Sequence, residues 1–227
     1  MRESTTALSR DADWLWSSEG ISFRQALEET QKLSACLISR SRVSGESYRY
    51  RIAWQHYGMG ALELNFMSGA TQRVMRTRSM IDHDRNNDFH LVLMQAGGAR
   101  MIHDGSDCEL APGAMILLNC AKSWDLMFPS SRLCLSARMD FRWLRRWLPD
   151  PSALAGRVVG AGDPWGAPMV EMMKAIAAEG IENAPMPHAL LADQMAGLLV
   201  LALAPREDVQ ARHGAELLRR IRAVIRD

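Results

Sequence analysis

The sequence predicts an α+β protein in which a sandwich or barrel of short strands is followed by helices. Two observations favour this class. Between about residues 48 and 138, short runs of alternating apolar and polar residues are separated by turn signals, which is typical of a β-sandwich or barrel. After residue 140 the apolar period becomes helical, and residues 21–38 also have a helical pattern.

The clearest strand signals lie between residues 89 and 140. Strands are expected where turn residues bound apolar runs, at 89–95, 99–103, 106–110, 114–119, 123–128 and 132–140. Asp104-Gly105 forms a favoured hairpin turn because glycine accepts positive φ. Pro112-Gly113 supplies a second tight turn. Upstream, residues 73–78 have a strand-like pattern, and residues 82–88 are expected to form a polar loop.

The strand expected at 89–95 has two apolar faces. Because side chains alternate along a strand, one face carries His90, Val92 and Met94, and the other carries Phe89, Leu91, Leu93 and Gln95. The alternation does not decide which of these faces points into the interior.

Composition and charge exclude several classes of protein. With 227 residues, 48% of them hydrophobic and 23% charged, the chain is long enough for one large domain, or for a domain with an appended helical part. A net charge of +1 favours neither a nucleic-acid binder nor a strongly acidic protein. Residues 195–204 form the longest run of small apolar residues, which is too short to span a bilayer, so no membrane association is expected.

Cysteine usage and the N-terminus indicate a cytoplasmic location. The four cysteines contain no CxxC pair, so we expect reduced thiols. The N-terminal residues have no apolar core of the signal-peptide type. Residues 1–20 are expected to be a mobile segment that precedes the folded part.

Two helices are expected at 169–180 and 188–204. The second is apolar on almost every side, which is typical of a buried helix, and a second copy of the chain is a natural partner for it. The sequence thus predicts a homodimer through residues 161–205. The expected contact residues are Met169, Met172, Met173, Ile176, Leu191, Met195, Leu198 and Leu199.

The final segment, 206–227, carries one amphipathic helix. Leu217, Ile221 and Val224 recur on one face and Arg219 and Arg222 on another, and no capping residue ends the helix. Such a helix either folds back on its own domain or leads into a further one.

Residues 20–227 resemble the N-terminal sensor and dimerisation part of an AraC/XylS-type transcription regulator. The stretches that carry the resemblance are 73–81, 88–119, 124–129 and 154–159, with Gly98, Asp104-Gly105 and Leu110–Gly113 as the most specific framework. The resemblance implies a cupin-like jelly-roll barrel over residues 21–160 that senses a small organic molecule. It also implies that 206–227 form the linker or start of a helix-turn-helix domain that is missing here. In the full-length protein, DNA and RNA polymerase are the expected further partners.

A cupin-type metal-dependent enzyme is the alternative. Such a site needs clustered ligands, commonly two histidines two residues apart on one strand and a further histidine on a later strand. The six histidines form no HxH pair, although His90 and His103 are close enough in sequence to face each other across a hairpin. We therefore expect no metal, no other cofactor and no catalytic residues.

Four residues are candidates for contact with the effector. Trp124 offers a flat wall for an aromatic ligand, and Arg78, if turned inward, would bind a carboxylate with two hydrogen bonds. His90 and Met94 are the remaining candidates, as a polar contact and a soft apolar one. For each there is a plain structural alternative: Trp124 and Met94 as core residues, His90 as a hydrogen-bonded strand histidine and Arg78 as a surface arginine.

Overall fold

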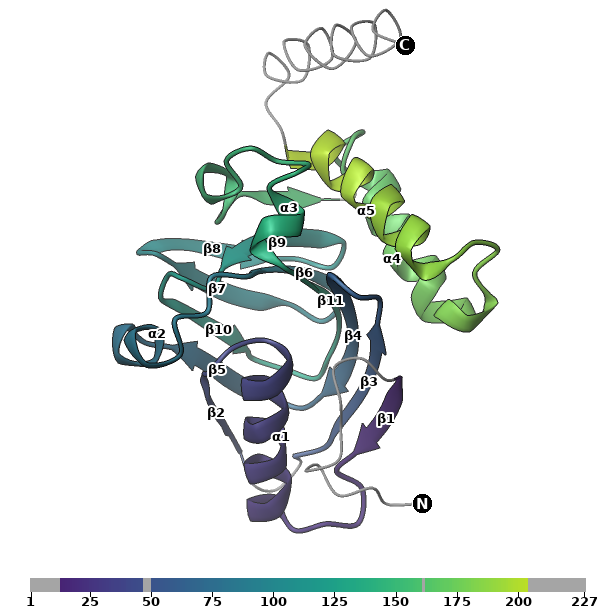
Figure 1. Ribbon diagram of the computed structural model, residues 1–227. Helices are drawn as coiled ribbons and strands as arrows, with labels where there is room; N and C mark the ends of the chain where they lie inside the picture. Colours follow the sequence, from purple (N-terminus) through teal and green to yellow (C-terminus); the bar gives the residue numbers. More distant parts are fainter. Residues whose placement is uncertain (1–12, 47–49, 161, 204–227) are drawn as a thin grey trace, which may run out of the picture.

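The computed structural model describes residues 13–46, 50–160 and 162–203, which form two antiparallel sheets with helices packed around them (Figure 1). The larger sheet has seven strands, in the spatial order β1 (Trp14–Ser17), β3 (Ile52–Gly58), β4 (Leu62–Gly69), β11 (Arg132–Met139), β6 (Phe89–Ala96), β9 (Ala114–Asn119) and β12 (Val158–Gly160). The smaller sheet has five, in the order β2 (Arg42–Gly45), β5 (Gln72–Arg76), β10 (Trp124–Phe128), β7 (Ala99–His103) and β8 (Ser106–Leu110). The α+β, jelly-roll-like class expected from the sequence is confirmed.

The seven-stranded sheet is buried on both faces. His90, Val92 and Met94 of β6 are buried on the face that packs against the five-stranded sheet, whereas Leu91 and Leu93 belong to a second apolar cluster on the opposite face. Successive side chains of a strand point to opposite faces, so each strand in the centre of this sheet contributes to both clusters. This is why the alternation in residues 89–95 could not identify the inner face.

Helices α4 (Ala167–Glu179) and α5 (His188–Leu203) cover the outer face of that sheet (Figure 1). Six of the eight residues expected at a dimer interface are buried within this chain, where they pack on β4, β6, β9 and β11: Met169, Met173, Ile176, Leu191, Met195 and Leu199. Met172 and Leu198 are half-buried against the same cluster. The outer face of the sheet is itself apolar and covers these residues within a single copy, so their burial does not require a second copy.

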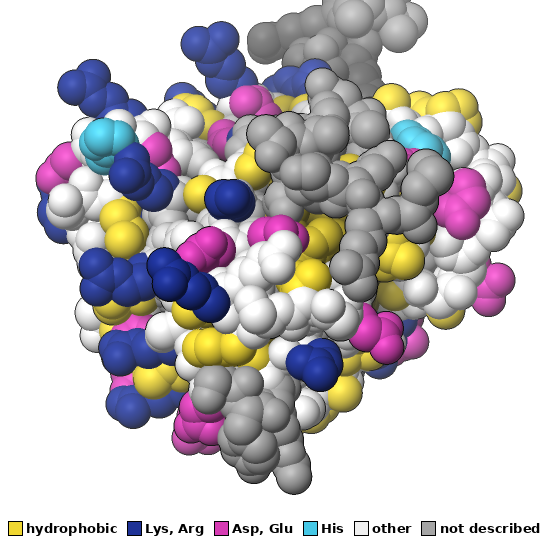
Figure 2. All heavy atoms as spheres, turned by 90° about the horizontal axis from the view of Figure 1, so that it is seen from below, with side chains coloured by type: hydrophobic (Ala, Val, Ile, Leu, Met, Phe, Trp, Pro, Cys, Tyr) yellow, Lys and Arg dark blue, Asp and Glu magenta, His cyan; other side chains and the backbone are white. Residues whose placement is uncertain are grey.

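Helix α1 (Phe23–Leu37) packs along β2 and closes one side of the space between the sheets. The Ser22 hydroxyl caps its first turn by accepting a hydrogen bond from the Gln25 N–H (3.3 Å). Ala26, Leu33 and Leu37 place the apolar side of the helix in the inner cluster. The molecule is seen from the α1 end in Figure 2, where, outside the grey atoms, apolar side chains form small areas among charged ones.

Three short segments differ from the sequence-based expectations. Residues 14–17 form β1 and pair with β3 instead of belonging to a mobile segment, and Trp16 is buried. β5 ends at Arg76, and α2 (Arg78–Asp84) occupies the stretch expected to continue as strand and loop. The remaining short elements are α3 (Phe141–Leu144) and two 3-10 turns, η3 (Ser152–Leu154) and η4 (Ile181–Asn183).

The hairpin at Asp104-Gly105 has the predicted geometry. Both residues have positive φ, 47° and 86°, and they connect β7 to β8 in register from His103 and Ser106 onward. Residues 206–227, including the expected terminal helix, lie outside the described residues. Among the described helices, none is long and apolar enough to cross a membrane.

Candidate functional site

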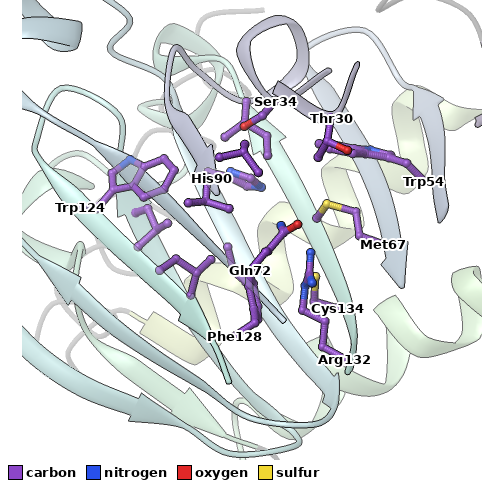
Figure 3. A pocket seen from close by; sticks show the side chains of 16 residues that line it. Thr30, Ser34, Trp54, Met67, Gln72, His90, Trp124, Phe128, Arg132 and Cys134 are labelled. Carbon is purple, nitrogen blue, oxygen red and sulfur yellow. The ribbon is translucent and has the colours of Figure 1, made fainter. Parts of the chain in front are cut away.

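A cavity of about 40 Å³ lies between the two sheets, beneath α1 (Figure 3). Its wall comes from both sheets and the helix, and contains Thr30, Ser34, Ile38, Val43, Trp54, Met67, Gln72, Val74, His90, Val92, Leu118, Trp124, Leu126, Phe128, Arg132 and Cys134. The space corresponds to about three or four water molecules. The wall is mostly apolar with a few polar groups, which is the usual composition of a small-molecule site.

Several polar groups of this wall are already hydrogen-bonded within the protein. The Thr30 hydroxyl donates to the Ala26 carbonyl (2.7 Å), and the Ser34 hydroxyl lies 2.7 Å from that of Ser41. The Trp54 Nε1–H donates to Asn65 Oδ1 (2.9 Å), and Gln72 Oε1 accepts from the Tyr50 hydroxyl (3.2 Å). These groups already have hydrogen-bond partners in the protein and do not require a ligand as a partner.

Three other polar atoms of the wall have no such hydrogen-bond partner in the described part of the chain. His90 Nε2, Trp124 Nε1 and Arg132 Nε are buried and have no hydrogen-bond partner among the described residues. A buried polar group without a partner is unfavourable, and the great majority in folded proteins are paired. Together these atoms are therefore the strongest indication of where a ligand binds.

The three groups differ in charge. Burial, and secondarily the positive charge of Arg138, lowers the pKa of His90 from 6.5 to about 3, so its imidazole is neutral at physiological pH. Burial also raises the pKa of the Cys134 thiol, which keeps it neutral. Arg132 is buried as well, and arginine stays charged in proteins. No Asp or Glu is among the residues that line the cavity, so its described wall carries a net positive charge.

Two of the four predicted ligand contacts line the cavity, and two do not. Trp124 and His90 approach it from opposite sheets. Met94 is fully buried in the inner cluster but lies outside the cavity wall. Arg78 is 82% exposed and lies in the first turn of α2, where it faces Asp82 at 3.4 Å. The structure therefore removes Arg78 from the candidate site.

Among the described residues, the buried arginines are Arg76 and Arg132. Arg76 is satisfied by protein groups, since it donates to Asp84 (2.6 and 2.8 Å), the Cys120 carbonyl (2.8 Å) and the Arg40 carbonyl (2.7 Å). Arg132 was not anticipated, because an arginine that begins a strand next to a turn is normally expected in solvent. No feature of the sequence identifies it.

His90 and His103, which the sequence allowed to face each other across a hairpin, lie on different sheets, in β6 and β7. His103 Nε2 accepts a hydrogen bond from the Asn119 N–H (3.1 Å), and burial lowers the pKa of His103. Within residues 13–46, 50–160 and 162–203, no group of three or more His, Cys, Asp or Glu side chains is placed to hold a metal ion.

Comparison with known proteins agrees with this architecture. The model of the AraC-binding-like domain family matches residues 34–204. The crystal structure of the AraC-like transcriptional activator CuxR superposes with a TM-score of 0.73 at 9% identity, covering 86% of this chain and 70% of that one. No curated protein matches the sequence.

Two further structures are similar over a smaller part of the fold. The EutQ protein of Clostridium difficile gives a TM-score of 0.33 at 12% identity, covering 41% of this chain and 71% of that one. The Cupin_2 domain of an XRE family transcriptional regulator from Enterobacter cloacae gives 0.30 at 13% identity, covering 35% and 82%.

The fold is an α+β, jelly-roll-like pair of antiparallel sheets with helices packed around them. The chain belongs to the AraC-binding-like domain family, since the family model spans most of its length.

Proposed function

We propose that this chain is the effector-sensing part of an AraC-type transcription regulator, and that it binds a small organic molecule in the cavity between its two sheets. In the full-length protein, DNA binding and any contact with RNA polymerase would belong to a further domain. The observation that carries the proposal is a set of three buried polar atoms that line one cavity, on His90, Trp124 and Arg132. None of them has a hydrogen-bond partner in the part of the chain that the structure describes.

The seven-stranded sheet offers a route from the cavity to the helices. His90 and Cys134 line the cavity on one face of this sheet, while their chain neighbours Leu91 and Leu135 pack in the outer cluster with α4 and α5. A ligand that widens the space between the sheets shifts β6 and β11, and these strands support both helices. Close-packed interiors transmit such displacements because they contain little free volume.

The function also includes a homodimer, whose interface is the solvent-facing side of α5. Leu190 and Leu201 are 53% and 40% exposed, and half-buried Leu198 lies between them in sequence. Leu190, Gly197 and Leu201 recur at the spacing of one helical face. An exposed apolar stripe of this kind supports association with a second copy.

The sensor function is tested by thermal unfolding in the presence of a panel of small organic acids, amines, alcohols and sugars. A compound that binds only the folded chain raises the melting temperature. Val92→Leu adds a methylene group to the cavity wall and should reduce the shift of any such compound. Val158→Leu is the matched control, because Val158 is an exposed residue of β12, and this variant should respond like the wild type.

Two results would contradict the sensor function. One is a panel in which no compound raises the melting temperature of the wild type. The other is a set of shifts that are equal in Val92→Leu and Val158→Leu, since the compounds would then bind elsewhere.

A further inference from the structure

Arg132 has an unusual position for an arginine. It begins β11, and its guanidinium points into the interior between Gln72 and Met67 (Figure 3). The residue is only 5% exposed. A buried charge is normally paired with an opposite charge, because removing it from water costs several kcal/mol.

The protein supplies only part of that compensation. Arg132 Nη1 donates to the Ala70 carbonyl (2.7 Å), and the guanidinium carbon lies 3.9 Å from the centroid of the Phe128 ring. Both contacts favour a cation, and both help to fix its position. Within the described part of the chain, however, no carboxylate lies within ion-pair distance of Arg132, and its Nε–H has no acceptor.

Two other arginines of the barrel, buried Arg76 and half-buried Arg138, show what is missing. Arg76 pairs with Asp84, and Arg138 pairs with both Glu63 and Asp88. In each case one or two acidic side chains reach the guanidinium. Among these three arginines, only Arg132 lines the cavity, and only Arg132 lacks an acidic partner among the described residues.

We infer that the effector is a small organic carboxylate, and that its carboxylate accepts the Arg132 Nε–H inside the barrel. This inference rests on the proposed sensor function and names the ligand class of the same cavity. The apolar body of the ligand lies against Leu126, Phe128 and Val92, which line the same space. At the far end of β10, the Trp124 Nε1–H is available to an acceptor on a longer ligand.

The size of the cavity limits the size of the apolar part of the ligand. A space of about 40 Å³ equals about three or four water molecules, so propionate requires a small movement of the wall and a ring requires a larger one. The wall formed by α1 is held by side-chain contacts. Gln31 donates to the Ser41 carbonyl and accepts from the Val43 N–H (2.7 Å). The Ser34 hydroxyl meets that of Ser41 (2.7 Å), and the Trp16 Nε1–H of β1 donates to Glu29 (2.9 Å).

Matched pairs of probes separate the charge of the ligand from its shape. Propionate and propionamide have the same outline, as do benzoate and benzamide, but only the acids carry a charge. Affinities for the wild-type chain are measured by calorimetric titration. In at least one pair the acid should bind about tenfold more tightly or better, as expected for a hydrogen bond to a charged partner.

Variants then test whether Arg132 is the group that binds the carboxylate. Arg132→Gln should remove the preference for the acid, and Arg132→Lys should retain part of it. Arg100→Gln is the control, because Arg100 is an exposed residue of β7 that pairs with Asp107, and it should keep the full preference.

The outcomes distinguish this inference from the sensor function. Amides that bind as tightly as the acids in both pairs would overturn the carboxylate assignment and leave the sensor function standing. A preference for the acids that survives Arg132→Gln in a folded variant would also overturn it. Failure of both pairs to bind would overturn the inference as well, whereas the sensor function falls only if the whole panel of small organic compounds also fails.

Discussion

Trp124 on the five-stranded sheet and His90 on the seven-stranded sheet line the same cavity, and neither Trp124 Nε1 nor His90 Nε2 has a hydrogen-bond partner within the described residues. The two side chains come from strands that are 34 residues apart, counted from position 90 to position 124. The packing of one sheet on the other brings them together. This arrangement leaves hydrogen-bonding capacity inside an apolar space, where a ligand would gain most from it.

His90 should make the fold sensitive to acid. Burial and the charge of Arg138 lower its pKa to about 3 in the folded chain, whereas the unfolded chain has the ordinary value of 6.5. Below pH 6.5 the unfolded state therefore binds a proton that the folded state excludes, and stability is lost as the pH falls toward 3. The contribution of His90 to the slope should be about 1.4 kcal/mol per pH unit.

Chemical denaturation between pH 7 and pH 4 measures this dependence. The free energy of unfolding of His90→Gln should fall less steeply with acid than that of the wild type. His83→Gln is the control, because His83 is an exposed residue of α2. Identical slopes for the wild type and His90→Gln would show that His90 is not a buried neutral histidine.

The Arg76–Asp84 pair should stabilise the junction between β5 and α2. Asp84→Ala leaves the buried Arg76 guanidinium without its carboxylate, and this should lower the free energy of unfolding by about 2–3 kcal/mol. The cost is smaller than that of breaking a fully buried ion pair, because the Asp84 side chain is 22% exposed. Asp82→Ala removes only an exposed pair with Arg78 and should cost less than about 0.5 kcal/mol. Equal costs for the two variants would refute this role of Arg76.

The proposed dimer should depend on the outer side of α5. Leu190→Asp combined with Leu201→Asp places charges in the proposed interface without disturbing the sheet contacts, because both residues are exposed in a single copy. Sedimentation should show a dimer for the wild type and a monomer for the double variant. Leu15→Asp, on the exposed edge strand β1, should remain dimeric.

A wild-type chain that sediments as a monomer at high concentration would contradict the dimer. Leu199→Asp is not a useful probe, since Leu199 is buried against the sheet of its own chain and its substitution would disturb the fold.

Much of the fold follows from local sequence signals. The turn at Asp104-Gly105 and the strands around it could be predicted because positive φ restricts which residues a turn accepts. Segments with weak local preference were mispredicted. β1 is only four residues long and owes its strand conformation to pairing with β3, and α2 is a short polar helix without a side-chain cap at Thr77.

The candidate site was less accessible to sequence reasoning. Trp124 and His90 could be proposed because they are polar or aromatic residues within apolar strands. Arg132 could not, since its burial depends on how β11 packs between β4 and β6 and on its contact with Phe128. The helix expected at 188–204 was predicted to be buried. Its described part, α5, packs on the outer face of the sheet of its own chain, which alternation alone could not distinguish from the inner face.

The most direct test of the central claim is a crystal structure of the chain with the compound that raises its melting temperature most. We predict that the compound lies between the two sheets, beneath α1, with hydrogen bonds to at least one of His90 Nε2, Trp124 Nε1 and Arg132 Nε. A compound bound on the outer surface, with the space between the sheets unchanged, would contradict the account.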